Sequence, residues 1–285
     1  MAGPSSRSIL RPMSSIQPSP SAGTMLREWR QRRRLSQLDL AGEAEISARH
    51  LSFVETGRAA ASRQVLHRLA EGLAMPLRER NALFLAAGFA PAFAEHSLEA
   101  PELAAARRAI DLVLEAHAPF PALVVDRHWN LITANAAVPP LMAGAAPALL
   151  APPINVLRLS LHPDGLASRI ENLGEWRAHL LERLQRQIAQ TGDAALLALR
   201  EELVRYPFRS SPRPPEALAG IAVPMLLRVP GLVRPLSLIS TTTVFGTPLD
   251  ITLAELALET FFPADAETRA WLERPMTGGP KGPEV

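Results

Sequence analysis

The chain has 285 residues, of which 47% are hydrophobic and 20% are charged, so it is long and apolar enough for two domains of ordinary size. It contains no cysteine, which excludes disulfides and thiolate metal sites, and it has no apolar run of the roughly 18 residues needed to span a bilayer. The formal net charge of +2 is unevenly distributed, because residues 1–88 hold 13 arginines against 7 acidic residues. The N-terminal part is therefore the candidate for binding nucleic acid, and we expect a cytoplasmic protein without membrane attachment.

The first segment, residues 1–23, is rich in Ser, Pro, Ala and Gly and lacks apolar periodicity, so we expect a disordered tail. The last segment, residues 274–285, has the same character and is expected to be a second flexible tail. Between these tails the patterns predict a helical domain over 24–90, a linker helix over 91–118 and an α+β domain over 119–273.

The helical domain divides into five short amphipathic segments, which is typical of a compact all-α domain. Four capping residues and one proline mark the predicted helix starts: Thr24, Ser36, Ser47, Ser62 and Pro76. The second and third predicted helices, 37–44 and 48–56, are separated by only three residues. Two short helices joined in this way predict a helix-turn-helix, whose second helix enters the major groove of DNA.

Two motifs in this region resemble the XRE family of phage-repressor-like regulators. They are LSQ at 35–37 and EISARHLSFVETGR at 45–58. The resemblance implies a transcription regulator that binds a double-stranded DNA operator. One position departs from the pattern, because the family commonly has glycine in the turn where this chain has Glu45. A left-handed backbone at a residue other than glycine costs about 1 kcal/mol.

The resemblance places three candidate base contacts on the third helix. Arg49 lies on its first turn, where a guanidinium can donate two hydrogen bonds to a guanine. His50 and Ser52 are further candidates on the same helix. Phe53 has two interpretations: its ring meets a thymine methyl group in the groove, or it covers the helix pair.

Four other side chains are implied to contact the DNA backbone. Gln37 would contact a phosphate or the adjacent base, and Ser47 would cap the third helix and touch a phosphate. Arg58 and Arg63 follow that helix and would reach the backbone or the minor groove. Arginine runs such as 30–34 are usually solvated helix faces, but beside a helix-turn-helix we expect this one to face DNA.

Residues 97–117 have apolar side chains at helical spacing, including Leu103, Ile110 and Leu114. We expect this helix to connect the two domains. The sequence leaves open whether it also pairs with the same helix of a second copy. A homodimer is expected, because single helix-turn-helix units seldom bury enough surface on one half-site.

From residue 119 the pattern alternates between strands and helices. Strands are predicted at 122–126, 129–134, 223–229, 236–245 and 254–262, and long amphipathic helices at 175–190 and 193–205. The elements predict an α+β domain with a five-stranded antiparallel sheet and helices on one face. Their order and number resemble a PAS-like sensor domain.

Three groups of residues resemble the ligand-binding domain of MmyB-like regulators. They are PALVVD at 121–126, NVLR at 155–158 with HPDG at 162–165, and FGTPLD at 245–250 with ETFFPAD at 259–265. The resemblance implies a one-component regulator whose PAS-like domain holds a small, largely apolar molecule. The implied ligand is a bound fatty acid or a similar apolar small molecule.

Seven residues are candidates for a ligand site in this domain. The polar candidates for a head group are Asn135, Arg158 and His162. The apolar candidates are Leu180, Leu184, Leu238 and Phe245. Each has a structural alternative, because Asn135 could only cap a helix, Arg158 could only pair with a surface acid, and the motif at 162–165 could only form a turn. The leucines and the phenylalanine could equally fill a solid core.

No motif for catalysis or for metal binding rises above background in the sequence, so we expect neither an enzyme nor a metalloprotein. The function favoured is a ligand-responsive, sequence-specific transcription regulator. The alternative is a DNA-binding regulator whose C-terminal domain only dimerises or binds a protein partner, without ligand. An enzyme with an attached DNA-binding module is the third and weakest hypothesis.

Overall fold

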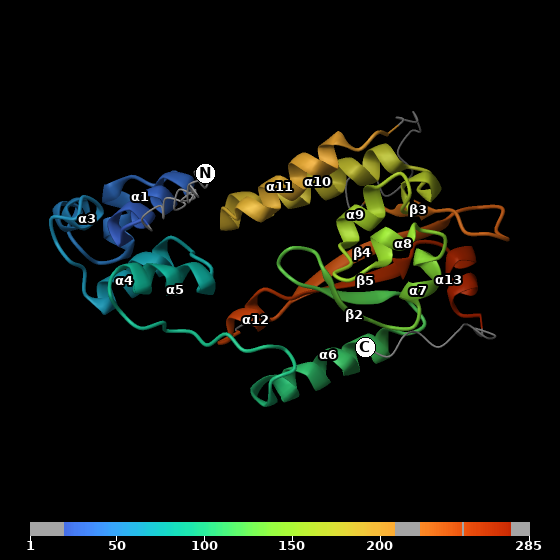
Figure 1. Ribbon diagram of the computed structural model, residues 1–285, viewed down its shortest axis with the longest axis horizontal. Helices are drawn as coiled ribbons and strands as arrows, with labels where there is room; N and C mark the ends of the chain where they lie inside the picture. Colours follow the sequence, from blue (N-terminus) through green and yellow to red (C-terminus); the bar gives the residue numbers. More distant parts are fainter. Residues whose placement is uncertain (1–19, 209–222, 247, 275–285) are drawn as a thin grey trace, which may run out of the picture. The chain divides into compact units, whose positions relative to one another are not determined.

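The computed structural model describes residues 20–208, 223–246 and 248–274 (Figure 1). The predicted tails lie almost wholly outside these ranges. Contacts divide the chain into two compact units between Ala92 and Phe93, and each unit is described by itself. In the ranges just given, no helix has both the length and the apolar character that a membrane span requires.

The N-terminal unit consists of five helices, as predicted. They are α1 (Ala22–Arg32), α2 (Gln37–Glu43), α3 (Ala48–Glu55), α4 (Arg63–Gly72) and α5 (Leu77–Ala86). One buried side chain or more from each helix forms the core: Leu26, Trp29, Leu40, Leu51, Leu66, Leu69, Leu83 and Phe84. The apolar stripes recognised in the sequence therefore point inward, and their burial is the main driving force that holds five short helices together.

Serine side chains cap three of these helices where the sequence predicted them. Ser36 caps α2 in a capping box with Asp39, and Ser47 and Ser62 cap α3 and α4. The prediction for α1 was wrong, because Ser21 and not Thr24 is the cap, accepting a hydrogen bond from the backbone N–H of Thr24 at 3.2 Å. Serine and threonine are both favoured at the N-cap, but only Ser21 has the extended backbone that an N-cap needs. The predicted tail at 1–23 therefore extends too far, because Ser21 and the residues after it belong to the cap and to α1.

The C-terminal unit contains a five-stranded antiparallel sheet, as predicted. Its strands are β1 (Ala122–Val125), β2 (Leu131–Ala134), β3 (Met225–Leu227), β4 (Leu236–Val244) and β5 (Ala257–Pro263), in the order β2-β1-β5-β4-β3. Its helices are α6 (Ala104–His117), α7 (Val138–Met142), α8 (Pro147–Leu150), α9 (Val156–Leu161), α10 (Leu173–Thr191), α11 (Ala194–Arg205), α12 (Ile251–Ala254) and α13 (Ala266–Leu272). Two short 3₁₀ helices, η1 (Pro101–Leu103) and η2 (Ala167–Arg169), accompany them.

Helices cover both faces of this sheet and not one, which corrects the sequence prediction (Figure 1). The inner strand β1, between β2 and β5, shows why, because all four of its residues are buried. Leu123 and Val125 belong to the large core that includes α9, α10 and α11, whereas Ala122 and Val124 pack with Ile110 and other residues on the opposite face. Side chains alternate along a strand, so a fully apolar strand requires cover on two sides.

The predicted linker helix is part of this second layer. Within α6, Ile110 and Leu114 pack against Ala122, Val124 and Leu256. Its apolar stripe is therefore used inside the C-terminal unit, and the connection between the units is the extended segment before η1. The amphipathic pattern predicted the helix correctly, but it could not say which surface the helix would cover.

Candidate functional site

The turn between α2 and α3 has the geometry of a helix-turn-helix. Glu45 has a φ of 53°, so it adopts the left-handed conformation for which the family usually provides glycine. The turn closes with a hydrogen bond from Ile46 N to Ala41 O at 3.0 Å. The side chain of Glu45 extends into solvent, where it meets Arg68 at 3.1 Å. The departure from glycine is thus accommodated without a change in the turn.

Arg49 lies exposed on the first turn of α3, two residues after the capping Ser47. Its guanidinium carbon lies 5.3 Å from the ring centroid of Phe53, within the range of a cation–π contact. The half-buried Phe53 therefore supports Arg49 from one turn further along the helix, a role that neither sequence interpretation included. His50 and Ser52 on the same helix are half-buried.

Arg58 and Arg63 are both exposed, one after the end of α3 and the other at the start of α4. The guanidinium carbon of Arg63 lies 5.4 Å from the ring centroid of Phe84. The two arginines flank the loop that follows α3, so both are positioned to meet a DNA backbone beside that helix. Their contacts with DNA, like those of Arg49, stay predictions.

Gln37 is held by a buried charged group that the sequence analysis missed. Glu55, at the end of α3, accepts hydrogen bonds from Arg30 at 2.6 and 2.9 Å and from Gln37 Nε2 at 2.8 Å. The carboxylate thereby ties α1, α2 and α3 together. An amide nitrogen carries two hydrogens, so Gln37 keeps a second donor for a phosphate.

The environment of Glu55 keeps it ionised. Burial acts to raise its pKa, but the hydrogen bonds from Arg30 and Gln37 and the positive charge of Arg30 outweigh burial and hold the pKa below its usual value of 4.5. The pKa of Arg30 is raised in turn, chiefly by the hydrogen bond to Glu55. The sequence signal for this cluster was weak, because its members lie far apart in the chain.

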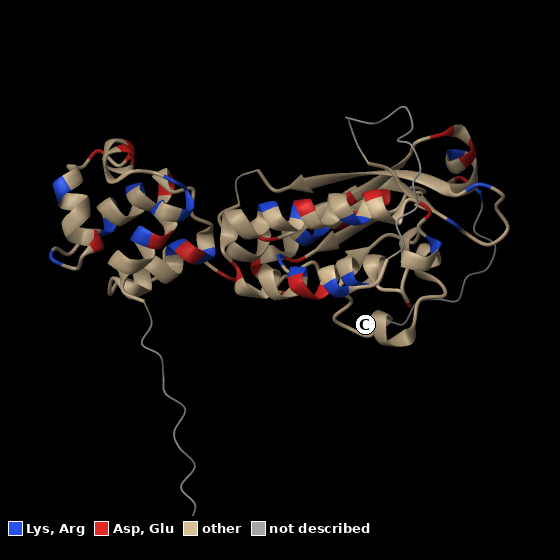
Figure 2. Ribbon diagram, turned by 90° about the horizontal axis from the view of Figure 1, so that it is seen from above, with Lys and Arg blue, Asp and Glu red and all other residues tan. Residues whose placement is uncertain are grey.

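The arginine run at 30–34 does not act as one DNA-facing surface, which corrects that prediction. Arg30 pairs with Glu55, and Arg33 donates to the backbone oxygens of Leu73 and Ala74 at 2.8 and 3.1 Å, at the C-terminal end of α4. Both arginines stabilise the fold. Figure 2 shows acidic as well as basic positions along the helices of this unit.

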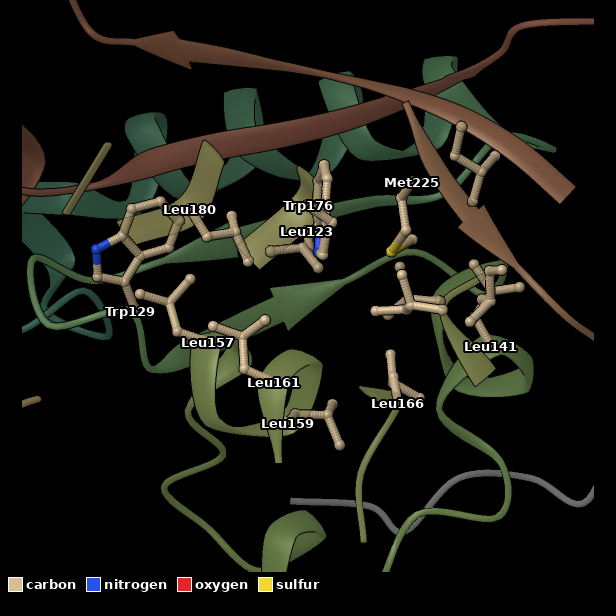
Figure 3. Packing of buried hydrophobic residues seen from close by; sticks show 14 of the residues in the cluster. Leu123, Trp129, Leu141, Leu157, Leu159, Leu161, Leu166, Trp176, Leu180 and Met225 are labelled. Carbon is tan, nitrogen blue, oxygen red and sulfur yellow. The ribbon is translucent and has the colours of Figure 1, made fainter. Parts of the chain in front are cut away.

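The C-terminal unit contains an apolar cavity of about 90 Å³, partly open to solvent, between the sheet and the helices that cover it. The lining is mainly aliphatic and aromatic: Pro121, Leu123, Trp129, Leu131, Val138, Leu141, Met142, Val156, Leu157, Leu159, Leu166, Trp176, Leu180, Met225, Leu227 and Phe261. Several of these side chains, among them Leu157, Leu180 and Met225, converge from α9, α10 and β3 (Figure 3). The two tryptophans direct their N–H groups to protein acceptors, Trp176 to Ser160 at 2.9 Å and Trp129 to Gln187 at 2.7 Å.

Four polar residues complete the lining: Ser160, Arg183, Ser240 and Glu259. Arg183 on α10 forms an ion pair with Glu259 on β5, with Nη1 at 2.9 Å from Oε2 and Nη2 hydrogen-bonded to Oε1. The guanidinium carbon also lies 4.5 Å from the ring centroid of Trp129. The cavity thus has charged groups at one end, and the rest of its lining is largely apolar.

Of the seven ligand-site candidates, only Leu180 lines the cavity. Leu184 and Leu238 are fully buried in the core beside it. Phe245 is 37% exposed, just after the end of β4. These three apolar candidates have the right composition, but packing places them away from the open space.

The three polar candidates serve structural roles. Asn135 accepts from the backbone N–H groups of Ala122 and Ala137 and donates to the oxygens of Leu114 and Phe120, so it joins α6, β1 and the start of α7. It does so without being the N-cap of α7, which is Ala137. The alternatives for the other two were an ion pair for Arg158 and a turn at 162–165, and the contacts of Arg158 and His162 agree with these alternatives.

Arg158 forms two hydrogen bonds of 2.8 Å with Glu202 of α11, outside the cavity lining. Tyr206 donates to the same carboxylate, and burial together with this bond raises the pKa of Tyr206 to about 12. His162 packs edge-on against Tyr206, with 4.9 Å between ring centroids. The motif at 162–165 is a turn, closed from Gly165 N to His162 O at 2.9 Å.

Arg183 could have been found in the sequence. Along α10 it lies seven residues after Trp176 and three after Leu180, on the helical face that these two apolar residues define. A charged residue on a buried face requires a partner, and the acidic residue of β5 is Glu259, which is one of the buried residues of that strand. The tryptophans of the lining had no comparable signal, because a buried tryptophan usually belongs to a solid core.

Two family models match the chain. The model described as MmyB-like transcription regulator ligand binding domain matches residues 106–274, and the model described as helix-turn-helix domain matches residues 21–83. The first match begins inside α6, in agreement with the position of this helix in the C-terminal unit. No curated protein matches the chain.

Proposed function

We propose that this chain, which belongs to the family of MmyB-like transcription regulators, is a one-component regulator that binds a small apolar ligand in its C-terminal cavity. The helix-turn-helix makes it a DNA-binding transcription regulator. The observation that carries the ligand proposal is the apolar cavity with a single charged end, in the same chain as that helix-turn-helix. The order of the five strands supports the further description of the C-terminal unit as PAS-like.

The proposed operator contacts come from the start of α2, from α3 and its cap, and from the loop between α3 and α4. Arg49 is the proposed base contact, with His50 and Ser52 as secondary ones. Gln37, Ser47, Arg58 and Arg63 are the proposed backbone contacts. The fixed position of Gln37 on Glu55 supports its role, because a preordered donor loses less entropy on binding.

The ligand proposal must accommodate the size of the cavity. Pockets that enclose drug-sized molecules measure about 300 to 1000 Å³, several times the 90 Å³ here. The cavity therefore fits a slim apolar group, and a longer acyl chain needs neighbouring side chains to move. Met142 and Met225 are unbranched and flexible, which supports such widening. A fatty acid or a similar molecule of fatty-acyl character is the proposed ligand class.

A homodimer that contacts itself through α6 is the proposed assembly. The outer side of this helix carries Leu112, which is 66% exposed, and Val113, which is 46% exposed. Arg108 and Glu115 lie two turns apart on one flank, so an antiparallel pair of α6 helices would bring each arginine opposite a glutamate of the other copy. This arrangement would leave both helix-turn-helix units available for one two-fold operator.

The small volume of the cavity also favours a second candidate function. In that alternative the C-terminal unit holds no ligand and serves only to dimerise or to bind a protein partner. The two functions differ in whether any small molecule changes operator binding.

Operator binding with and without candidate ligands tests the proposal. We expect the full chain to bind a fragment from upstream of its own gene with strong salt dependence, and an apolar compound from a panel of acyl derivatives to shift that affinity. Intrinsic fluorescence gives a second readout, since Trp129 and Trp176 line the cavity. Specific DNA binding that no compound alters would favour the alternative, and absence of specific binding would contradict both.

A further inference from the structure

The two ionisable groups in the cavity lining neutralise each other. Arg183 and Glu259 are the charged residues among those that line the cavity, and their side chains are only 20% and 6% exposed. Both terminal nitrogens of Arg183 donate to the carboxylate of Glu259, and Thr242 donates to it at 2.9 Å. The carboxylate thus accepts three hydrogen bonds, and the pair contributes no net charge.

The histidine near the pair adds no positive charge, and Arg186, the next arginine along α10, is exposed and lies outside the cavity lining. His179, one turn before Arg183, stacks on Trp176, and its pKa is lowered by burial and then by the charges of Arg183 and Arg186. The imidazole is therefore neutral at neutral pH. The remaining polar groups of the lining are the hydroxyls of Ser160 and Ser240, which donate and accept hydrogen bonds but carry no charge.

A free carboxylate that entered this cavity would be a second anion beside a single buried cation. It would have to compete with Glu259 for Arg183 while being repelled by Glu259 at close range. Burying an unpaired charge is far more unfavourable than burying a hydrogen-bonded neutral group. An amide, an ester or an alcohol of the same chain length avoids this penalty and can use the serine hydroxyls.

We propose that the cavity selects ligands with an uncharged head group, such as amides, esters or alcohols with an apolar chain, and that Glu259 excludes free carboxylic acids. This inference rests on the proposed function, because it presupposes that the cavity binds an apolar molecule. It narrows the ligand class, since the fatty acid itself is disfavoured and its neutral derivatives are favoured.

Binding to the full chain should be compared for acids and primary amides matched in chain length, from butanoate and butanamide to decanoate and decanamide, at neutral pH. Tryptophan fluorescence or calorimetry gives the affinities. We expect the amide to bind at least about tenfold more tightly than the acid of equal length. An acid that binds as tightly as its amide overturns the inference and leaves the sensor function standing. Failure of every acid and amide to bind contradicts both.

Substitution of Glu259 tests the cause of the preference. In Glu259→Gln the shape is conserved and Arg183 loses its counter-ion, so we expect the affinity for the acid to rise about tenfold and the preference for the amide to disappear. The doubly neutral variant Arg183→Gln/Glu259→Gln should restore the preference for the amide, which separates charge from an effect on folding. A preference unchanged in both variants contradicts the role of Glu259.

The chain offers a matched control in the other arginine–glutamate pair. Arg158 and Glu202 also form a two-point pair, through Nε and Nη2 of the arginine, but they lie outside the cavity lining. Glu202→Gln should leave the ratio of acid to amide affinity unchanged. A change as large as that in Glu259→Gln would show that net charge of the domain, and not the cavity pair, sets the preference.

Discussion

Glu55 is a single residue on which the position of a proposed DNA contact depends. Its buried carboxylate holds Arg30 and Gln37 and so joins three helices. Its pKa lies below the usual value of 4.5. A carboxyl group whose pKa is depressed by folding adds stability above its unfolded pKa, and this contribution is lost as the pH falls through the folded value.

Replacement of Glu55 by Gln should destabilise the N-terminal unit by about 3 kcal/mol at neutral pH, because Arg30 loses its buried partner. The difference from the wild type should shrink as the pH falls below 4.5 and vanish below the depressed pKa of the folded protein, where the wild-type carboxyl is protonated as well. Hydrogen exchange of the α3 amides measures both effects.

The control for Glu55 is Glu45→Gln, which removes an exposed acid of the same unit that meets Arg68. Surface pairs of this kind contribute about 0 to 1 kcal/mol, so little change is expected at any pH. A difference between wild type and Glu55→Gln that persists undiminished in acid would contradict the ionised pair as its origin.

Arg49 and Arg58 should respond differently to truncation. Arg49→Ala removes the proposed two-point contact to a guanine, so it should cost about 1 to 3 kcal/mol at the operator and relax the base preference at one position. Arg58→Ala should weaken specific and random DNA alike. Competition binding with operator variants measures both, and an equal loss on specific and random DNA for Arg49→Ala would exclude it as a base contact.

At the scale of single residues, the sequence predicted the features that depend on residues close together in the chain. The serine caps and the buried leucines followed from local rules, because a cap bonds within one turn and a stripe repeats with the helix. The cluster around Glu55 and the pair of Arg183 with Glu259 did not, since each joins residues from separate helices or strands. Leu38 is apolar and lies in α2, yet it is 73% exposed, because this short helix buries only Leu40 and Ala41.

At the scale of elements, α6 shows what periodicity leaves undecided. Its inner stripe packs on β1, and its outer side retains Leu112 and Val113 in solvent. An amphipathic pattern identifies a helix and its apolar side, but it does not name the surface against which that side packs. The cavity could not be predicted from the sequence either, because it forms where side chains from several elements leave a space between them unfilled.

The proposed α6 interface predicts that Leu112→Glu converts the dimer to a monomer, because it places a charge at the centre of an apolar contact. Light scattering coupled to size-exclusion chromatography measures the mass. Leu197→Glu is the matched control, since Leu197 is a 44% exposed leucine on α11. A wild type that is monomeric, or a Leu112→Glu variant that stays dimeric, would contradict this interface.

At the scale of the whole molecule, regulation requires a physical link from the cavity to the chain that leads to the helix-turn-helix. The connecting segment is bound to α12, because His96 Nδ1 lies 2.8 Å from Asp250 Oδ2 and Thr252 donates to His96 O at 2.6 Å. Helix α12 directly precedes β5, and β5 carries Glu259 and Phe261 of the cavity lining. A ligand that moves β5 therefore acts on the element that anchors the connector.

The central claim is that this cavity controls DNA binding, and a cavity-filling variant tests it most directly. Leu180→Phe fills space in the cavity, whereas Leu181→Phe adds the same volume to a half-buried neighbour that does not line it. Operator affinity should be measured for both variants and for wild type, with and without the apolar compound that binds wild type most tightly. We predict that all three bind the operator and that only Leu180→Phe fails to respond to the compound. A response of Leu180→Phe equal to that of the wild type would contradict the claim.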